Sequence, residues 1–213
     1  MLKYRLIFFD LDGTLLECKS SWELIHRRFH TMEDARQALE QYRLGEITYR
    51  EFMAKDILSW LRKKPKIHIK EIEEALSDYK LKPGAEEVIA ELKRRGLKVI
   101  ILTAAIDLLA EKVGRQLRAD AVLSNRLQVD RYGYLTGKGI EAVDPYKKDE
   151  AMKRISREQS VPLEQTIAVG DSIYDLNMLE AAGLGLYSGN IEDIKSQNIR
   201  PIHTLREILA YIE

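Results

Sequence analysis

Cysteine is nearly absent from this chain of 213 residues, which contains only Cys18. One cysteine cannot form an intramolecular disulfide, and this composition favours a reducing compartment. The N-terminal apolar run Leu6–Phe9 is too short for the hydrophobic region of a signal peptide, and no small-residue cleavage site comes after it. We therefore expect a cytoplasmic protein.

The chain also lacks an excess of charge of either sign, because 34 Lys and Arg residues balance 34 Asp and Glu residues. A net charge of zero gives no general attraction for nucleic acid or for an anionic membrane surface. The longest nearly apolar run, residues 98–106, is far shorter than the roughly 20 residues that cross a bilayer. We expect neither nucleic acid nor membrane as a partner, and the oligomeric state stays open.

Strand and helix patterns alternate along the chain and are interrupted once. Residues 5–10 have the apolar pattern of a strand buried on both faces, and apolar residues at helical spacing between about 20 and 79 predict about four helices. After Pro83-Gly84, strands again alternate with helices. The predicted fold class is α/β, with a doubly wound (Rossmann-like) parallel sheet as the core and a small helical cap domain inserted after the first strand. We assign residues 1–16 and 80–213 to the core domain and residues 17–79 to the cap.

The second part of the chain divides into short predicted elements. Helices are expected at 86–95, 107–118, 148–158, 174–182 and 205–212, and strands at 97–102, 121–123, 166–169 and 184–187. Two alternating runs around residues 127–136 predict a hairpin.

Ligands of an open parallel sheet bind at the carboxyl ends of its strands, so the residues directly after each strand are the candidate site. Asp10 and Asp12 come after the first strand, Thr103 and Ala104 after the second, and Asp171 after a later one. Carboxylates gathered at one edge repel one another unless a cation lies between them. Oxygen ligands without His or Cys point to Mg²⁺.

These residue types suit the hydrolysis of a phosphate monoester. Asp10 would attack phosphorus to form an aspartyl phosphate, and Asp12 would donate a proton to the leaving group and then activate water. Gly13 would allow a tight turn after the strand. Thr103 would bind phosphoryl oxygens, and Lys148 would neutralise their charge.

The segments Phe9–Leu15 and Gly170–Asp175, together with Thr103 and Lys148, resemble the four motifs of the haloacid dehalogenase-like superfamily of phosphohydrolases, and more narrowly the phosphoserine phosphatases. The resemblance implies that Asp10 is the nucleophile and Asp12 the general acid and base. It implies that Mg²⁺ is held by Asp10, by the backbone carbonyl of Asp12 and by Asp171. Ser172 and Asp175 would support this site, with Asp175 orienting metal-bound water or Lys148.

The chain departs from the phosphoserine phosphatase pattern in two places. Thr103-Ala104-Ala105 stands where these enzymes usually have Ser-Gly-Gly, so Ala104 places a methyl group near the substrate. Lys19 and Asp56 stand where the family uses a glutamate and an arginine to hold the amine and the carboxylate of serine. Either the substrate is a different phosphomonoester, or a neighbour such as Glu17, Glu23 or Arg50 takes over the role; Lys19 and Asp56 can equally pair with each other or face solvent.

Aromatic and histidine side chains of the cap have simpler expected roles. Trp22 and Trp60 are predicted to form the core of the cap, and His26 and His30 to lie on its surface.

Taken together, these residues lead us to expect a Mg²⁺-dependent phosphatase of a small soluble phosphomonoester. A phosphotransferase or phosphomutase, or a receiver-like regulatory protein phosphorylated on Asp10, is the alternative. Dehalogenase chemistry would leave Asp12 and the metal ligands without a role.

Overall fold

The computed structural model describes residues 3–190, 192, 194 and 196–212. Its centre is a seven-stranded sheet with the order β4-β3-β2-β1-β5-β6-β7. All neighbouring strands are parallel except β3 and β4, which form an antiparallel hairpin. The strands are β1 Leu6–Phe9, β2 Lys98–Ile106, β3 Ala121–Val129, β4 Leu135–Ile140, β5 Thr166–Gly170, β6 Leu184–Tyr187 and β7 Ile199–Pro201.

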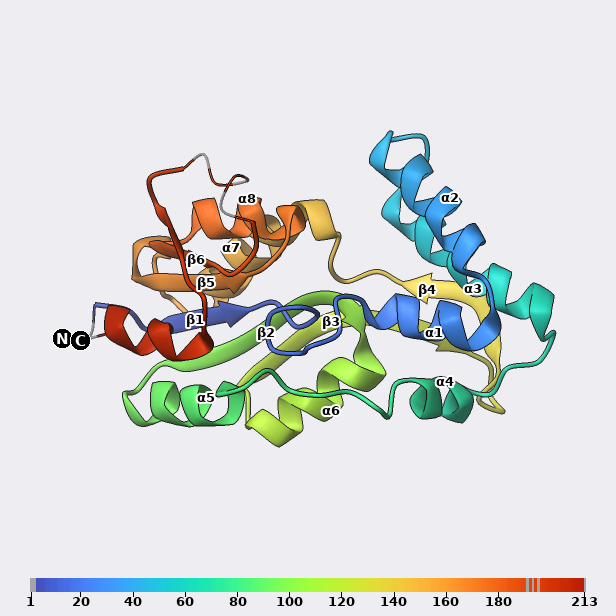
Figure 1. The fold of residues 1–213 in the computed structure, drawn as a ribbon, viewed down its shortest axis with the longest axis horizontal. Coiled ribbons are helices and arrows are strands. Elements are labelled where there is room, and N and C mark those ends of the chain that lie inside the picture. The colour runs from blue at the N-terminus through green and yellow to red at the C-terminus, as the bar shows by residue number, and fades with distance from the viewer. Residues whose placement is uncertain (1–2, 191, 193, 195, 213) are drawn as a thin grey trace.

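Helices cover both faces of the sheet, which confirms the predicted doubly wound α/β fold (Figure 1). Ile7 and Phe9 of β1 pack into one apolar layer with residues of α5 (Ala85–Arg94), α6 (Asp107–Leu117) and the 3₁₀ helix η5 (Leu205–Tyr211). Leu6 and Phe8 point to the opposite face, which packs on α7 (Lys148–Glu158) and α8 (Leu176–Ala181). The continuous apolar run of β1 is thus explained by burial of successive side chains on opposite faces.

The inserted block forms four helices, as predicted: α1 Ser21–Phe29, α2 Met32–Arg43, α3 Tyr49–Lys63 and α4 Ile69–Ala75. Local capping signals set where they begin. Thr48 and Glu51 form a reciprocal capping box at the start of α3, and Ser20 accepts a hydrogen bond from the Glu23 N–H at the start of α1. We refer to α1–α4 as the cap helices. They lie together at one end of the molecule, away from the two chain ends (Figure 1).

The β3–β4 hairpin packs against α3 of the cap helices. A Cβ added at Gly137 would lie 2.9 Å from Leu58, and one added at Gly139 would lie 3.1 Å from Met53. Glycine at these two positions therefore lets the hairpin backbone approach α3 closely. The division into a core domain and a cap domain at residues 16 and 80 stays a prediction.

Several predicted boundaries were wrong. The strand expected at 97–102 continues to Ile106, and the strand at 121–123 continues through the first arm of the hairpin as β3. The helix expected at 174–182 is divided into a 3₁₀ turn, η3 (Ile173–Asp175), and the short α8. The helix expected at 205–212 is the 3₁₀ helix η5. The strand β7 was not predicted, and neither were the 3₁₀ turns η1 Pro145–Lys147 and η2 Leu163–Gln165.

Within the described part of the chain, no helix combines the length and apolarity that a membrane span needs.

Candidate active site

Three carboxylates meet at the carboxyl ends of the two central strands. Asp10 comes directly after β1, and its N–H donates to the Val169 carbonyl of β5 over 3.0 Å. Asp171 comes directly after β5, and Asp175 ends the 3₁₀ turn η3. One oxygen of each carboxylate lies within 4.8 Å of the others. The parallel pairing of β1 with β5 therefore brings residues that are far apart in the sequence to one point of the sheet edge.

Lys148, the first residue of α7, reaches into this cluster from the side. Its Nζ donates to Asp10 Oδ1 over 2.8 Å and to Asp175 Oδ1 over 2.6 Å, and its side chain is 3% exposed. Burial by itself lowers the pKa of Lys148, but the charges of Asp10 and Asp175 outweigh it and the pKa is raised. Burial raises the pKa of Asp10 to about 7 in spite of the Lys148 charge. Lys148 is thus the charged partner that makes a buried carboxylate at position 10 tolerable.

Asp175 organises the backbone of the loop after β5. Its Oδ2 accepts hydrogen bonds from the N–H groups of Asp171 and Ser172, over 3.1 and 3.0 Å, and from Ser172 Oγ over 2.9 Å. A Cβ at Gly170 would lie 2.4 Å from the Asp175 Cβ, so glycine is needed for this close approach. Asp175 contacts Lys148 as expected, and its other bonds show that it also fixes the loop that carries Asp171.

Asp12 is held by the first helix of the cap. Its Oδ2 accepts a hydrogen bond from the Ser21 N–H over 2.6 Å, whereas Oδ1 is buried and has no partner among the described residues. Burial raises the pKa of Asp12 to about 6, against the effect of the Ser21 hydrogen bonds. A carboxyl group with a raised pKa at the N-terminus of α1 can exist in both protonation states near neutral pH.

Gly13 lies directly against the Asp171 carboxylate. Its φ of 76° lies in the left-handed region, and a Cβ there would lie 2.3 Å from Asp171 Oδ2. Thr14 donates to the other oxygen of the same carboxylate over 3.0 Å. Both the backbone conformation and the available space therefore require glycine at this position.

Thr103 and Ala104 lie within β2, because this strand is longer than predicted. Thr103 is buried, and its Oγ1 accepts a hydrogen bond from the Ala105 N–H over 3.2 Å. The Ala104 carbonyl accepts hydrogen bonds from Trp22 Nε1 over 3.1 Å and from the Tyr49 hydroxyl over 3.3 Å. This part of β2 is thus fixed by side chains of α1 and α3.

Asn125 is a site-supporting residue to which the sequence reasoning gave no role. Its Oδ1 accepts from the Ala142 and Val143 N–H groups, and its Nδ2 donates to the Val143 and Ala104 carbonyls, all between 2.7 and 3.2 Å. Period-two spacing with Leu123 and Leu127 was the available signal, because it places Asn125 on the inward face of β3.

The two cap residues expected to face substrate have different surroundings. Lys19 is exposed, whereas Asp56 is 1% exposed and its Oδ2 lies 3.3 Å from His26 Nε2. The prediction that His26 lies on the surface was wrong, because it is buried between α1 and α3. Its position four residues after Trp22, on the apolar stripe of α1, was the signal. Asp56 therefore pairs with His26, not with Lys19.

The remaining cap predictions have mixed outcomes. Trp60 is fully buried in the cap, as expected, and Trp22 is buried but also lines a cavity beside the sheet edge. Glu17 and Glu23 are exposed, and Arg50 is an exposed residue 4.0 Å from Glu141.

This cavity, of about 470 Å³, lies between the cap helices and the sheet edge. Asp10, Asp12, Thr103, Lys148 and Asp171 line its floor, and residues of α1, α2 and α3 form its other walls.

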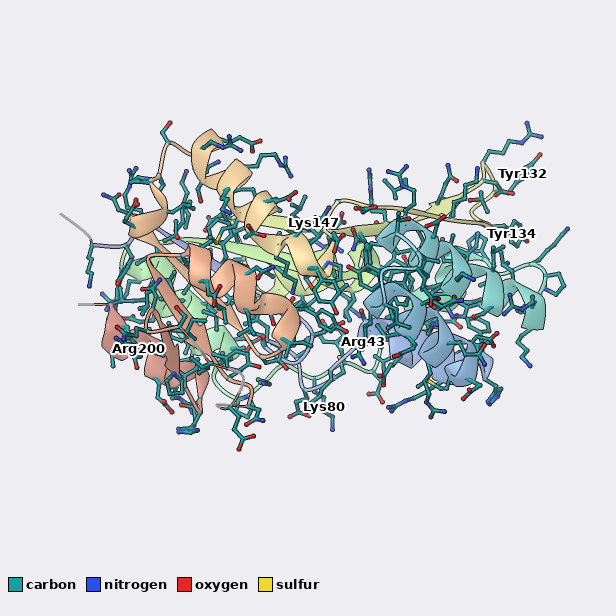
Figure 2. The ribbon with its side chains drawn as sticks, turned by 90° about the horizontal axis from the view of Figure 1, so that it is seen from above. Arg43, Lys80, Tyr132, Tyr134, Lys147 and Arg200 are labelled. Atoms are coloured by element: carbon teal, nitrogen blue, oxygen red, sulfur yellow. The ribbon has the colours of Figure 1, made fainter. Side chains whose placement is uncertain are left out.

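Two contacts connect α2 with the core beside this cavity. The Tyr42 hydroxyl donates to Asp144 Oδ1 over 2.5 Å, and Arg43 Nε donates to the Tyr174 hydroxyl over 3.0 Å. Figure 2 shows Arg43 at the junction of the cap helices with the core. The cap thus covers the carboxylate cluster.

The carboxylate cluster fits a hard divalent cation. Asp10, Asp171 and Asp175 supply only oxygen donors, and the pKa of Asp171 is raised by burial and by the Asp175 charge. One lysine charge for three clustered carboxylates, of which Asp10 and Asp175 are buried and Asp171 is partly buried, leaves negative charge uncompensated, which a bound cation would neutralise. Gly13 leaves room beside Asp171 where a side chain would collide.

Known proteins match both the sequence and the fold. The phosphoserine phosphatase of Methanocaldococcus jannaschii is 32% identical over 215 residues, which cover 99% of each chain. The phosphoserine phosphatase SerB2 of Mycobacterium tuberculosis is 33% identical over 183 residues, which cover 85% of this chain and 43% of that protein. A solved phospho-aspartyl intermediate analogue of phosphoserine phosphatase superposes with a TM-score of 0.81 at 31% identity, over 99% of this chain and 100% of that one.

A substrate-bound phosphoserine phosphatase superposes equally well, with a TM-score of 0.81 at 30% identity over 99% of both chains. The family model for haloacid dehalogenase-like hydrolases matches residues 7–180, which include every carboxylate of the cluster. The chain therefore belongs to the haloacid dehalogenase-like hydrolase family.

Proposed function

We propose that this protein is a Mg²⁺-dependent phosphatase that hydrolyses a small soluble phosphomonoester through an aspartyl phosphate. The observation that carries the proposal is the arrangement of Asp10 at the cavity floor, with Lys148 on one of its oxygens and Asp12 held by Ser21 nearby. The similarity to a phosphoserine phosphatase solved as a phospho-aspartyl intermediate analogue supports it.

In the first step, a carboxylate oxygen of Asp10 attacks phosphorus and the bond between phosphorus and the ester oxygen breaks. Lys148 already holds Asp10 Oδ1, so the other oxygen, Oδ2, is the one left to attack. The leaving alkoxide takes a proton from Asp12. The products of this step are the free alcohol and an aspartyl phosphate.

In the second step, Asp12 removes a proton from water while the water oxygen attacks phosphorus. The bond between phosphorus and Asp10 breaks, inorganic phosphate leaves, and Asp12 is again protonated for the next cycle. The Ser21 N–H holds one Asp12 oxygen, so the first cap helix positions the group that acts first as acid and then as base.

Asp10, Asp171 and the backbone carbonyl of Asp12 would hold Mg²⁺, with Asp175 shaping the loop beneath them. When bound, the ion supplies positive charge that reduces the repulsion between a phosphate dianion and the carboxylates of the site. Thr103 and the backbone around Ala104 would contact the phosphoryl oxygens, and Lys148 would offset their charge.

Phosphoserine itself is a poor fit to the cap. Lys19 is exposed at the cavity and Asp56 is buried in its wall, so the two charges are the reverse of those that would hold an amine and a carboxylate at these positions. We propose a different phosphomonoester and a cytoplasmic location, with no nucleic acid or membrane partner.

The test is hydrolysis of p-nitrophenyl phosphate with Mg²⁺ by the natural chain and by Asp10→Asn. We expect Asp10→Asn to lower turnover by about a thousandfold or more, because the nucleophile is lost. The exposed cap residue Asp78 gives the matched control Asp78→Asn, for which we expect unchanged turnover. Equal rates for Asp10→Asn and the natural chain would refute the mechanism.

The same assay separates the alternatives. Transfer of phosphate to added glycerol in preference to water would identify a phosphotransferase. A phosphorylated Asp10 that persists for minutes without turnover would identify a receiver-like regulator.

A further inference from the structure

The cavity has two chemically different ends. Its floor is formed by the carboxylates, Thr103 and Lys148, where the phosphoryl group would lie. Its far end lies within the cap and is lined mainly by apolar and aromatic side chains, together with His26 and Asp56: Trp22, Met32, Leu39, Tyr49 and Phe52. This far end would hold the leaving group.

The hydrogen bonds of His26 define its protonation. Trp60 Nε1, which can only donate, lies 3.1 Å from His26 Nδ1, and the Thr31 hydroxyl lies 2.8 Å from the same nitrogen. Nδ1 must therefore accept, which places the single ring proton on Nε2, the nitrogen 3.3 Å from Asp56 Oδ2. With the Nε2–H group facing it, an ionised Asp56 gives the pair one negative charge; burial raises the pKa of Asp56, and the contact with His26 opposes this shift.

The second oxygen of Asp56 has no partner. The Asp56 side chain is 1% exposed, and its Oδ1 is buried and accepts no hydrogen bond from any described residue. The hydroxyls at this end of the cavity are already engaged, Tyr42 with Asp144 and Tyr49 with the Ala104 carbonyl. A buried carboxylate oxygen without a donor is unfavourable, so a ligand that supplies one would gain a strong interaction here.

The basic side chains around the cavity do not neutralise Asp56. Lys148 is bound to Asp10 and Asp175, Arg36 pairs with Glu33 over 2.9 Å, and Arg43 donates to Tyr174. Among the described residues none of them forms an ion pair with Asp56, and Lys19 is exposed. The negative charge of the Asp56–His26 pair is therefore available to a ligand.

We propose that the Asp56–His26 pair selects phosphate monoesters of amino alcohols whose leaving group carries a primary ammonium and no carboxylate. This inference rests on the proposed phosphatase function and names its substrate class. The ammonium would donate to Asp56 Oδ1 and offset its charge, and the faces of Trp22 and Tyr49 or Phe52 would surround the alkyl chain and the cation. A hydroxyl would supply the hydrogen bond without the charge, and a carboxylate would be repelled.

The first experiment uses the natural chain and needs no variant. ω-Aminoalkyl phosphates of two to five carbons are compared with hydroxyalkyl and alkyl phosphates of equal length and with phosphoserine, by kcat/KM with Mg²⁺. We expect the best aminoalkyl ester to exceed its hydroxyl and methyl counterparts and phosphoserine by about tenfold or more, mainly through KM. Equal values for amine and hydroxyl, or faster hydrolysis of phosphoserine, would overturn the proposal.

The second experiment is Asp56→Asn, which keeps the shape of the side chain and removes its charge. We expect the ratio of kcat/KM between the aminoalkyl and the alkyl ester to fall toward one, while Asp78→Asn keeps the ratio of the natural chain. A ratio unchanged in folded Asp56→Asn would contradict the assignment.

Binding by the Asp10→Asn protein, measured by calorimetry with the same esters, separates this inference from the proposed function. A preference for the amine in binding without hydrolysis of any ester by the natural chain would refute the phosphatase and support the Asp56 site. Hydrolysis of p-nitrophenyl phosphate without any preference for the amine would support the phosphatase and refute the Asp56 site.

Discussion

Lys148 Nζ lies 2.8 Å from Asp10 Oδ1, although the two residues are 138 positions apart in the chain. Both side chains are buried, and the same ammonium also binds Asp175 over 2.6 Å. This lysine is therefore the element that allows two carboxylates to be buried at the sheet edge, and its removal has consequences for stability as well as for turnover.

We expect Lys148→Met to lower the free energy of unfolding by about 3 kcal/mol, because it leaves Asp10 and Asp175 buried without their cation. Urea denaturation at neutral pH without Mg²⁺ measures the effect. Its neighbour Lys147 is exposed and labelled in Figure 2, which makes Lys147→Met the matched control, with an expected change within about 0.5 kcal/mol. Similar losses in the two variants would show that the buried ion pairs do not stabilise the fold.

Asp12→Asn should separate the two chemical steps. With p-nitrophenyl phosphate, whose leaving group needs little protonation, attack by Asp10 continues, but no base remains to activate water. We expect a burst of about one equivalent of p-nitrophenolate, and after it a steady rate at least about 100-fold below that of the natural chain. Rapid-quench kinetics measures the burst, and Asp10→Asn, which lacks the nucleophile, should show none. An Asp12→Asn protein that turns over without a burst would argue against its role in the second step.

Gly13→Ala should weaken cation binding. The new Cβ would collide with Asp171 Oδ2 at 2.3 Å and would force an alanine into a φ of 76°. Mg²⁺ binding to the folded state raises the thermal midpoint of the natural chain by mass action, and we expect this rise to be lost in the variant. Gly45→Ala is the matched control, because Gly45 has a φ of 72° with no atom near its Cβ position. Its basal midpoint should fall, while its response to Mg²⁺ stays. An intact response in Gly13→Ala would place the cation elsewhere.

Glu91 gives a pH-dependent contribution to stability outside the site. Hydrogen bonds from Arg94 and then Arg95 lower its pKa from 4.5 to about 2. A carboxyl group whose pKa is lowered in the folded state stabilises the protein above its unfolded pKa, and this stabilisation is lost as the pH falls from about 4.5 toward 2. Glu91→Gln should therefore reduce the urea midpoint at pH 7 and have a smaller effect near pH 2.5. For the control we choose Glu180→Gln, since Glu180 is exposed and forms no ion pair with a described residue. An effect of Glu91→Gln on the urea midpoint that grows as the pH falls would contradict this pH dependence.

Local patterns were sufficient to predict the elements that carry Asp10, Asp12 and Asp171. A run of apolar residues that ends in Asp-x-Asp-Gly can only be a buried strand with a polar turn after it, and helical spacing in residues 21–75 is equally local. The end of β2 was not predictable in this way. Thr103-Ala104-Ala105 has no clear strand signal of its own, and Ala104 is held in β2 by Trp22 and Tyr49 from the cap.

The buried polar residues that support the site were harder to predict from the sequence. The sequence placed His26 on the surface of a helix and left Asn125 without a role, yet each is buried and hydrogen-bonded to groups from several elements. A polar residue can be buried only where other segments supply its partners, and those partners are not visible in its own neighbourhood.

By itself, the sequence determined the alternation of strands and helices, the inserted helical block and the acidic residues at the strand ends, because each depends on neighbours a few positions away. Only the tertiary structure decided which carboxylate oxygens Lys148 binds and that Asp56 is paired with His26. The energy of a buried charge depends on groups within a few ångströms of it in space. Those groups come together through the packing of α1 on α3 and of α7 on the sheet, at distances along the chain that no local pattern encodes.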